Sequence, residues 1–281
     1  MIMLEYRSYM KSLRPRIYPF LLIGFFLVLA KPGTAQYRYN KLVWSDEFEK
    51  SGLPDPSKWN YDRGRGCPLI CGWGNNEPQF YTWDRAENAR IEKGELIIEA
   101  RKESYEGTNY TSARITTKQK GDWTYGRFEV RALLPTGVGT WPAIWMLPTE
   151  NRYGGWPKSG EIDIAETVGY QKDTLHQTIH TEKYNGMYQT QRTNVMRLKG
   201  HGFKYHVYAI EWSADKIEYY LDGIKTYTFP KESDDTRVWP FNQPFHVILN
   251  MAIGGNFGGK KGIDDTIFPT QMRVDYVRVY Q

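Results

Sequence analysis

The chain has 281 residues, of which 40% are hydrophobic and 15% aromatic, and it carries a formal net charge of +5. Residues 1–35 hold five Lys or Arg and one Glu, so the remainder has a net charge of only about +1. This balance excludes the broad basic face that binds nucleic acid or an anionic membrane surface.

The first predicted element is a leader. Basic residues up to Arg16 precede the apolar run Ile17–Ala30, and small residues up to Ala35 fit a cleavage site before Gln36. The run is short for a membrane span, although an uncleaved anchor is the alternative. The sequence therefore predicts a signal peptide over 1–35 and a secreted or periplasmic protein without membrane attachment after cleavage.

Residues 36–281 are long enough to form one domain with a sizeable core. Alternating apolar and polar residues predict a series of strands, and we expect an all-β fold without internal repeats or a second domain. A hairpin is expected at Gly94 and a tight turn at Asp222-Gly223. The predicted strands cover 41–49, 89–93, 95–102, 111–118, 125–135, 139–148, 174–182, 206–212, 216–223, 224–229, 246–253 and 272–281.

Cys67 and Cys71 are the only cysteines of the chain. Three residues separate them, in an irregular stretch of a chain predicted to be exported. A local disulfide is the favoured prediction, because exported proteins meet an oxidising environment. Two free thiols are the alternative.

The most informative stretch is 159–169, with the sequence SGEIDIAETVG. In a strand, Glu161 and Asp163 point to the same face, whereas Glu166 is at the wrong parity. One extra residue, a β-bulge, would bring all three acids to one face. Carboxylates so close repel one another, so at least one proton is held above its usual pKa. A raised-pKa acid beside an ionised carboxylate suits glycosidic bond cleavage.

A helix is the alternative for this stretch, and it would leave the acids on different, solvated faces. The β-branched residues Ile162, Ile164 and Val168 favour a strand, and Gly160 and Gly169 flank it.

The stretch EIDIAE resembles the Glu-x-Asp-x-x-Glu signature of glycoside hydrolase family 16, in the bulged form of its laminarinases, which are endo-1,3-β-glucanases. The resemblance extends over nearly all of 36–281, through LVWSDEF, GWGNNE, TSARITTK, YGRFEVRALLP, GTWPAIWMLP, HVYAIEW, LNMAIGGNF and VDYVRVY. It implies a jelly-roll β-sandwich of two curved antiparallel sheets with a concave substrate cleft, and a retaining mechanism.

The resemblance also assigns the catalytic roles. Glu161 would be the nucleophile and Glu166 the general acid and base. Asp163, between them, would tune the nucleophile and help keep Glu166 protonated.

Eight further residues are candidates for substrate binding. Trp141 and Trp145, four residues apart on a strand, share a face. On pattern alone, core packing is the favoured role of these two tryptophans. The resemblance instead implies that they line the substrate cleft. Likewise Arg114 and His180 have ordinary surface or structural roles as alternatives. The full set is Asn76, Arg114, Trp141, Trp145, Trp156, His180, Asn250 and Phe257. One departure from the family is Pro78, where an aliphatic residue is common.

Family members often hold a structural Ca²⁺, for which Glu47, Gly94 and Asp275 are the candidates; oxygen ligands suit this hard cation. Catalysis is expected to need no cofactor. We expect a monomer that hydrolyses β-1,3-glucan and binds no nucleic acid. A mixed-linkage β-1,3-1,4-glucanase is the alternative within the class, and a non-catalytic glucan-binding protein the alternative outside it.

Overall fold

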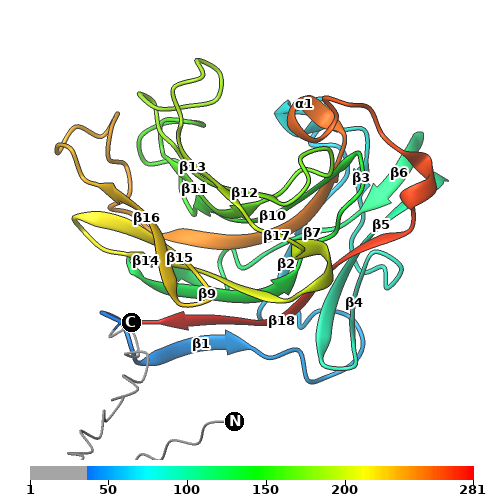
Figure 1. Cartoon of the computed structure of the whole chain (residues 1–281), viewed down its shortest axis with the longest axis horizontal. Helices are drawn as coiled ribbons and strands as arrows, with labels where there is room; N and C mark the ends of the chain where they lie inside the picture. The colour runs from blue at the N-terminus through cyan, green and yellow to red at the C-terminus, as the bar shows by residue number, and fades with distance from the viewer. Residues whose placement is uncertain (1–36) are drawn as a thin grey trace, which may run out of the picture. The chain divides into compact units, whose positions relative to one another are not determined.

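The computed structural model describes residues 37–281, so the predicted signal peptide lies outside the described residues. These residues form two large β-sheets that pack face to face (Figure 1). The strands pair antiparallel apart from one short parallel pair, β3 with β6. The all-β jelly-roll prediction is therefore confirmed.

Each sheet combines strands that follow one another in the chain with strands that are far apart in it. In spatial order, the larger sheet runs β16 (Ile224–Pro230), β15 (Lys216–Leu221), β14 (His206–Trp212), β9 (Gly126–Leu133), β18 (Thr270–Tyr280), β5 (Glu95–Tyr105), β6 (Thr108–Ser112) and β3 (Phe80–Tyr81), with β1 (Leu42–Asp46) on β18 and β4 (Ala89–Glu92) on β5. The smaller sheet runs β13 (Arg192–Arg197), β12 (Thr174–His180), β11 (Glu161–Glu166), β10 (Thr140–Pro148), β17 (Phe245–Ile253), β7 (Arg114–Thr116) and β2 (Asn60–Asp62), with β8 (Asp122–Trp123) on β17.

Helical structure is confined to single turns within 37–281. They are the 3₁₀ turns η1 (Cys71–Gly74), η2 (His201–Phe203) and η3 (Asp265–Ile267) and the α-helical turn α1 (Gly255–Gly258). None of the helices in this range has the length and apolar character of a membrane span.

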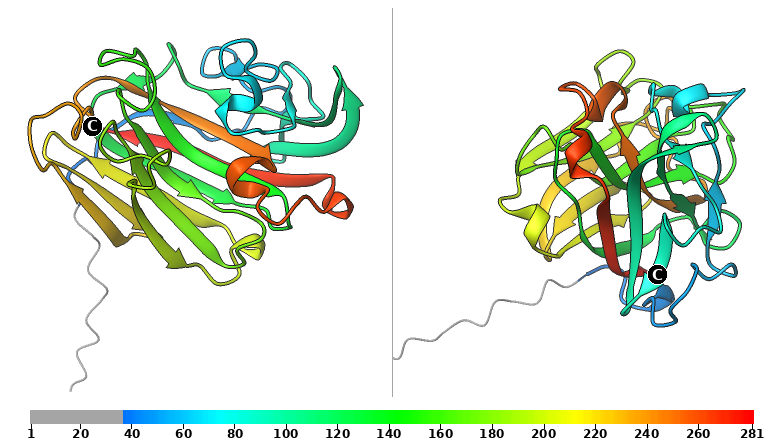
Figure 2. Two further views of the ribbon diagram at one scale, coloured as in Figure 1. Left: turned by 90° about the horizontal axis from the view of Figure 1, so that it is seen from above. Right: turned by 90° about the vertical axis from the view of Figure 1, so that its right-hand side faces the viewer.

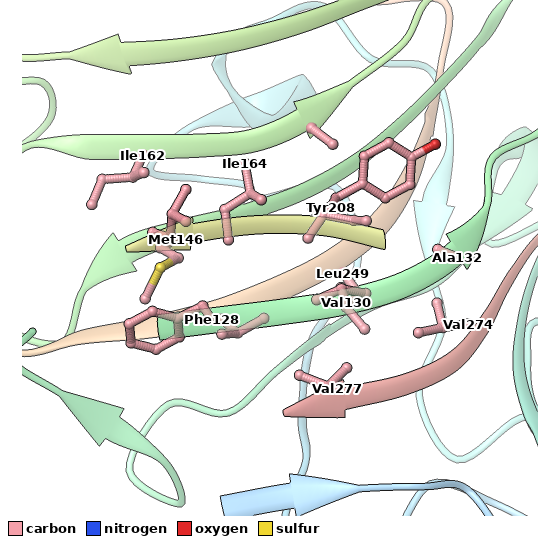
Figure 3. Close-up of a cluster of buried hydrophobic side chains, with 14 of the residues drawn as sticks. Phe128, Val130, Ala132, Met146, Ile162, Ile164, Tyr208, Leu249, Val274 and Val277 are labelled. Atoms are coloured by element: carbon pink, nitrogen blue, oxygen red, sulfur yellow. The ribbon is translucent and has the colours of Figure 1, made fainter. Parts of the chain in front are cut away.

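The hydrophobic core lies between the two sheets (Figure 3). In β9, Phe128, Val130 and Ala132 point inward at every second position, as strand geometry requires. They face apolar side chains of the smaller sheet, among them Ile162 and Ile164 of β11. The inward residues of β11 thus anchor its strand in the core, and its remaining side chains are left on the opposite face.

That opposite face of the smaller sheet is concave (Figure 1). The loop around residue 185 stands at one side of it, and α1 stands at the other (Figures 1 and 2). Side chains that leave β10, β11, β12, β17 and β7 on this side therefore converge.

Two segments differ from the sequence-based expectation. The predicted strand 111–118 is split at Ala113 into β6, which belongs to the larger sheet, and β7, which belongs to the smaller one. The segment 184–202, expected to be irregular, contains the edge strand β13 and η2. An edge strand half exposed to solvent needs no apolar alternation, which is why the polar RTNVMR gave no signal. The Asp222-Gly223 turn is confirmed, with positive φ at both residues.

The first described residues are fixed to the outer face of the larger sheet. The ring centroid of Tyr37 lies 3.6 Å from the guanidinium carbon of the buried Arg127. The Arg38 amide donates to Glu211 Oε1 at 3.1 Å. The Lys41 carbonyl accepts from the Gln281 amide at 2.9 Å. The start of the described chain is thus held to both β14 and the C-terminus.

Candidate active site

The acids of β11 share the concave face because the strand contains a bulge. Asp163 is opposite Thr178 on β12, whereas Glu166 is opposite His176, so three residues of β11 match two of β12. The register on β10 shifts at the same point. The extra residue turns Glu166 to the side of Glu161 and Asp163, while Ile164 and Ala165 are fully buried. The bulge expected from the sequence is present.

Asp163 occupies the centre of this group and is only 1% exposed. Burial raises its pKa well above the usual range, and the charges of Glu161 and Glu166 raise it further. The pKa of Glu166 is raised to about 7 by burial, with a smaller contribution from Glu161. A carboxyl that keeps its proton near neutral pH can serve as a general acid.

Each of the outer acids receives the indole N–H of a tryptophan. Trp141 of β10 donates from Nε1 to Glu166 Oε1 at 2.9 Å. Trp156, in the loop before β11, donates to Glu161 Oε2. The structure therefore brings Trp141 and Trp156, two of the three predicted tryptophans, to the acids of β11.

His180 of β12 lies opposite Glu161. Its Nε2 is 3.3 Å from Asp163 Oδ2, and its ring centroid is 5.8 Å from that of Trp156. One ligand atom each of Glu161, Asp163 and His180 lies within 4.8 Å of the others, a set that is also able to bind a cation.

Trp145 and Asn250 belong to a second network on the same face. Trp145 Nε1 donates to Asn250 Oδ1 at 2.7 Å, and Asn250 Nδ2 donates to Tyr81 Oη at 2.9 Å. Tyr81 Oη in turn donates to Glu77 Oε2 at 3.3 Å. Burial raises the pKa of Glu77, which also accepts from Gln79 at 2.6 Å. This buried chain holds the Trp145 ring in place.

Arg114 of β7 lies between two indoles. Its guanidinium carbon is 4.6 Å from the ring centroids of both Trp73 and Trp145, and Asp62 Oδ2 is 2.7 Å from its Nε. Trp73 was not among the predicted site residues, although it stands in the GWGNNE stretch. Only the fold shows that this loop covers Arg114.

Asn76 and Phe257 lie at the α1 side of the face. Asn76 Nδ2 donates to Asn256 Oδ1 at 2.8 Å. Phe257 packs edge-on against Trp141 at 5.6 Å and against His176 at 5.1 Å. A Cβ on Gly258 would approach Trp141 Cβ to 2.8 Å, so only glycine lets α1 pack this closely.

His176 is a further residue that the sequence reasoning missed. It lies opposite Glu166 across the β11–β12 pair, and its Nε2 is 2.7 Å from Gln171 Oε1. Burial and the charge of Lys260 lower the pKa of His176 to about 4, so this imidazole is neutral at neutral pH. The sequence held a signal for His176, because it lies four residues before His180 in the same predicted strand and therefore points to the same face.

The candidate calcium ligands lie away from this face. Glu47 follows β1, Gly94 joins β4 to β5, and Asp275 is in β18, which pairs with both β1 and β5. Glu47 is bound through both oxygens by Arg278, and Asp275 Oδ2 is 2.6 Å from Arg131 Nη1. The structure joins Cys67 to Cys71, the first residue of η1, in a disulfide.

The sequence and the fold both match known proteins. A curated β-glucanase of Rhodothermus marinus is 54% identical over 248 residues, covering 86% of this chain and 85% of the relative. The solved laminarinase of Rhodothermus marinus superposes with a TM-score of 0.82 at 55% identity, covering 86% and 97% of the two chains. The laminarinase of Flavobacterium sp. UMI-01 gives 0.79 at 46% identity, covering 86% and 100%. Residues 76–278 match the model of glycosyl hydrolases family 16, and the chain belongs to this family.

Proposed function

We propose that this chain is an endo-glycosidase that hydrolyses β-1,3-glucan with retention of anomeric configuration. The observation that carries the proposal is the bulge in β11, which brings Glu161, Asp163 and Glu166 to one concave face. An aromatic side chain stands beside each outer acid, as expected where sugar rings stack.

In the first step, Glu161 attacks the anomeric carbon and forms a glycosyl–enzyme ester. The bond to the leaving sugar breaks as Glu166 gives its proton to the glycosidic oxygen. The raised pKa of Glu166, about 7, keeps this proton available. The nucleophile must be ionised at the same time, and its indole partner Trp156 donates to it in that state.

In the second step, Glu166 is ionised and takes a proton from water, and the oxygen of this water attacks the anomeric carbon. The ester to Glu161 breaks, and the two inversions give net retention. Asp163 lies next to both acids, so its proton and charge tune them as a coupled set. Neither step requires a metal or an organic cofactor.

The names of the relatives support β-glucan as the substrate. Both solved relatives described above are laminarinases, and the curated one is a β-glucanase. The name β-glucanase does not specify the linkage, so mixed-linkage β-1,3-1,4-glucan is the alternative substrate. A product profile on laminarin and lichenan separates the two, since the proposed enzyme degrades laminarin faster.

Removal of each catalytic acid tests the mechanism. Glu161→Ala eliminates the nucleophile, so laminarin turnover should fall by several orders of magnitude, and added azide should give the α-glycosyl azide. Glu166→Ala should retain cleavage of an activated aryl glycoside, and azide should then give the β-glycosyl azide. Glu150→Ala, at an exposed acid after β10, is the matched control. Near-normal laminarin hydrolysis by both variants would contradict the proposal.

The proposal includes export and action as a monomer that binds neither nucleic acid nor a membrane after cleavage. The order of basic, apolar and small residues in 1–35 supports export, and the net charge of about +1 in 36–281 supports the absence of polyanion binding. Secreted protein should begin at Gln36 by N-terminal sequencing and should elute as a monomer in size-exclusion chromatography with light scattering.

We also propose a structural Ca²⁺ between β1, β18 and the Gly94 turn. The strand pairing supports this site, because Asp275 is in β18, which pairs with β1 before Glu47 and with β5 after Gly94, and oxygen donors suit a hard cation. Arg278 and Arg131 now neutralise the two carboxylates, so an ion has to compete with them. After EDTA treatment, added Ca²⁺ should raise the Tm of the wild type and not that of Asp275→Asn. An equal Tm with and without Ca²⁺ in the wild type would contradict this site.

A further inference from the structure

The ring of His180 is held by a backbone group of the following loop. The Gly186 amide lies 3.2 Å from His180 Nδ1 and donates a hydrogen bond to it. A backbone N–H is only a donor, so Nδ1 must present its lone pair. In a neutral imidazole the hydrogen is then on Nε2.

The other ring nitrogen faces a buried oxygen that lacks a hydrogen-bond partner. His180 Nε2 is 3.3 Å from Asp163 Oδ2, and this oxygen accepts no hydrogen bond within residues 37–281. With the hydrogen on Nε2, the ring points a donor at the carboxyl group. With the hydrogen on Nδ1, the Nε2 lone pair would face the lone pairs of an ionised Asp163 at a site that is shielded from water.

The position of the Gly186 amide is itself fixed by Asn185, which is fully buried. The Asn185 side-chain amide donates to the carbonyls of Thr181 at 3.2 Å and Glu182 at 3.0 Å. Its Oδ1 accepts from the amide of Met187 at 3.1 Å. The turn that carries Gly186 is therefore fixed on both sides by one side chain.

We propose that the turn 184–190 is a positioning element for the catalytic centre. Asn185 fixes the turn, the Gly186 N–H selects the neutral Nε2–H form of His180, and this form directs its N–H toward Asp163 Oδ2, 3.3 Å from Nε2. A hydrogen bond to the ionised form of a carboxyl favours that form, so the turn controls how tightly Asp163 holds its proton. Asn185 and Gly186 are positioning residues, because they act through His180. The assignment of a catalytic role to Asp163 rests on the proposed function, whereas the tautomer of His180 does not.

A matched pair of substitutions at one position tests the role of the N–H. Gly186→Pro removes the donor, whereas Gly186→Ala keeps it. The Cβ of the alanine would lie 3.5 Å from His180 Cε1, an ordinary contact. We expect Pro to lower kcat on laminarin about 10- to 100-fold, the range for loss of a partner that orients a functional group, with KM nearly unchanged. The alanine variant should lose much less.

The tautomer is measured directly by NMR of protein labelled with ¹⁵N-histidine. The chain has five histidines, and a His180→Asn spectrum assigns the signals of His180. At pH 7 the wild type and Gly186→Ala should show hydrogen on Nε2 of His180, and Gly186→Pro should show an increased share of the Nδ1–H form. His176, which contacts Gln171, should keep its signals in every variant.

A wild-type spectrum with hydrogen on Nδ1 of His180 overturns the proposal, and so does a folded Gly186→Pro variant with the kcat of Gly186→Ala. If Gly186→Pro does not fold, Asn185→Ala replaces it, since it frees the turn and keeps the N–H; an unchanged His180 spectrum in that variant would also overturn the proposal. The wild-type spectrum stands even if Glu161→Ala retains activity, so failure of the proposed function is recognised separately.

Discussion

Each outer acid of β11 accepts from one indole, and the effect of that hydrogen bond on the proton is clearest at Glu166. Burial raises its pKa, the Trp141 N–H lowers it by favouring the ionised carboxylate, and Glu161 raises it again, with a result of about 7. Because the proposed first step requires Glu166 to be protonated, activity should fall as pH rises through about 7.

Trp141→Phe tests this balance. Phenylalanine retains the packing against Phe257 and lacks the N–H, so the pKa of Glu166 should rise. The alkaline limb of kcat/KM should move to higher pH by about one unit. Trp145→Phe is the control, because its N–H goes to Asn250, and the limb should stay in place. A limb that moves equally in both variants, or not at all in Trp141→Phe, would refute this role of Trp141.

The sequence predicted residues whose neighbours in the chain carry the signal, and it missed those defined by contacts between distant segments. The parity of Glu161, Asp163 and Glu166 within one strand was readable. Trp73 gains its meaning only because it covers Arg114, about 40 residues later in the chain. The network of Glu77 and Tyr81 with Asn250 likewise depends on tertiary contacts that no local pattern encodes.

At the scale of the element, the bulge in β11 lets one strand both bury its apolar side chains and present its three acids. Ile162, Ile164 and Ala165 remain in the core, while the acids stay on the concave face. A regular strand would satisfy the same requirements with one residue fewer between Asp163 and Glu166. The bulge was predicted because the acid spacing demands it, whereas β13 was missed because a half-exposed edge strand has no apolar alternation.

Two single-residue deletions test the bulge. Deletion of Ala165 leaves an evenly spaced Glu-x-Asp-x-Glu strand with all three acids on one face, so activity should fall about 100-fold or less through misplacement. Deletion of Ile162 shifts Glu161 to the other face of the strand, with no bulge to absorb the change. That variant should be as inactive as Glu161→Ala. Laminarin assays on folded protein, checked by circular dichroism, compare them, and equal inactivity of both would argue against this interpretation.

At the scale of the whole described chain, the two sheets have separate tasks. The smaller sheet presents the candidate active site, and the outer face of the larger sheet binds the segment that starts at Tyr37. The sandwich class followed from the alternating strands, and the family resemblance supplied the topology. The contact of the N-terminal segment with Arg127 and Glu211 lay beyond sequence reasoning, because these partners are far apart in the chain.

A shortened protein that begins at Lys41 should therefore be less stable. It lacks Tyr37, whose ring packs on the Arg127 guanidinium, and the Arg38 amide, which donates to Glu211. Both buried charged groups therefore lose a stabilising contact. We expect the free energy of unfolding to fall by about 1–3 kcal/mol, with a lower Tm. Laminarin hydrolysis well below the Tm should not change. Asn40→Ala, at an exposed position, is the control, and a Tm equal to that of a protein that begins at Gln36 would contradict the prediction.

Because tryptophans lie both in the core and at the concave face, intrinsic tryptophan fluorescence can report on two different events. Of the ten tryptophans, Trp59, Trp212 and Trp239 are at most 2% exposed in the core. Trp73, Trp141, Trp145 and Trp156 lie at the concave face, beside Arg114 or the acids Glu161 and Glu166 of β11. A bound oligosaccharide would change the emission of the second group and leave the first untouched, whereas unfolding would shift the emission of the first group to the red. Binding and unfolding could thus be followed in one unlabelled sample at a single excitation wavelength.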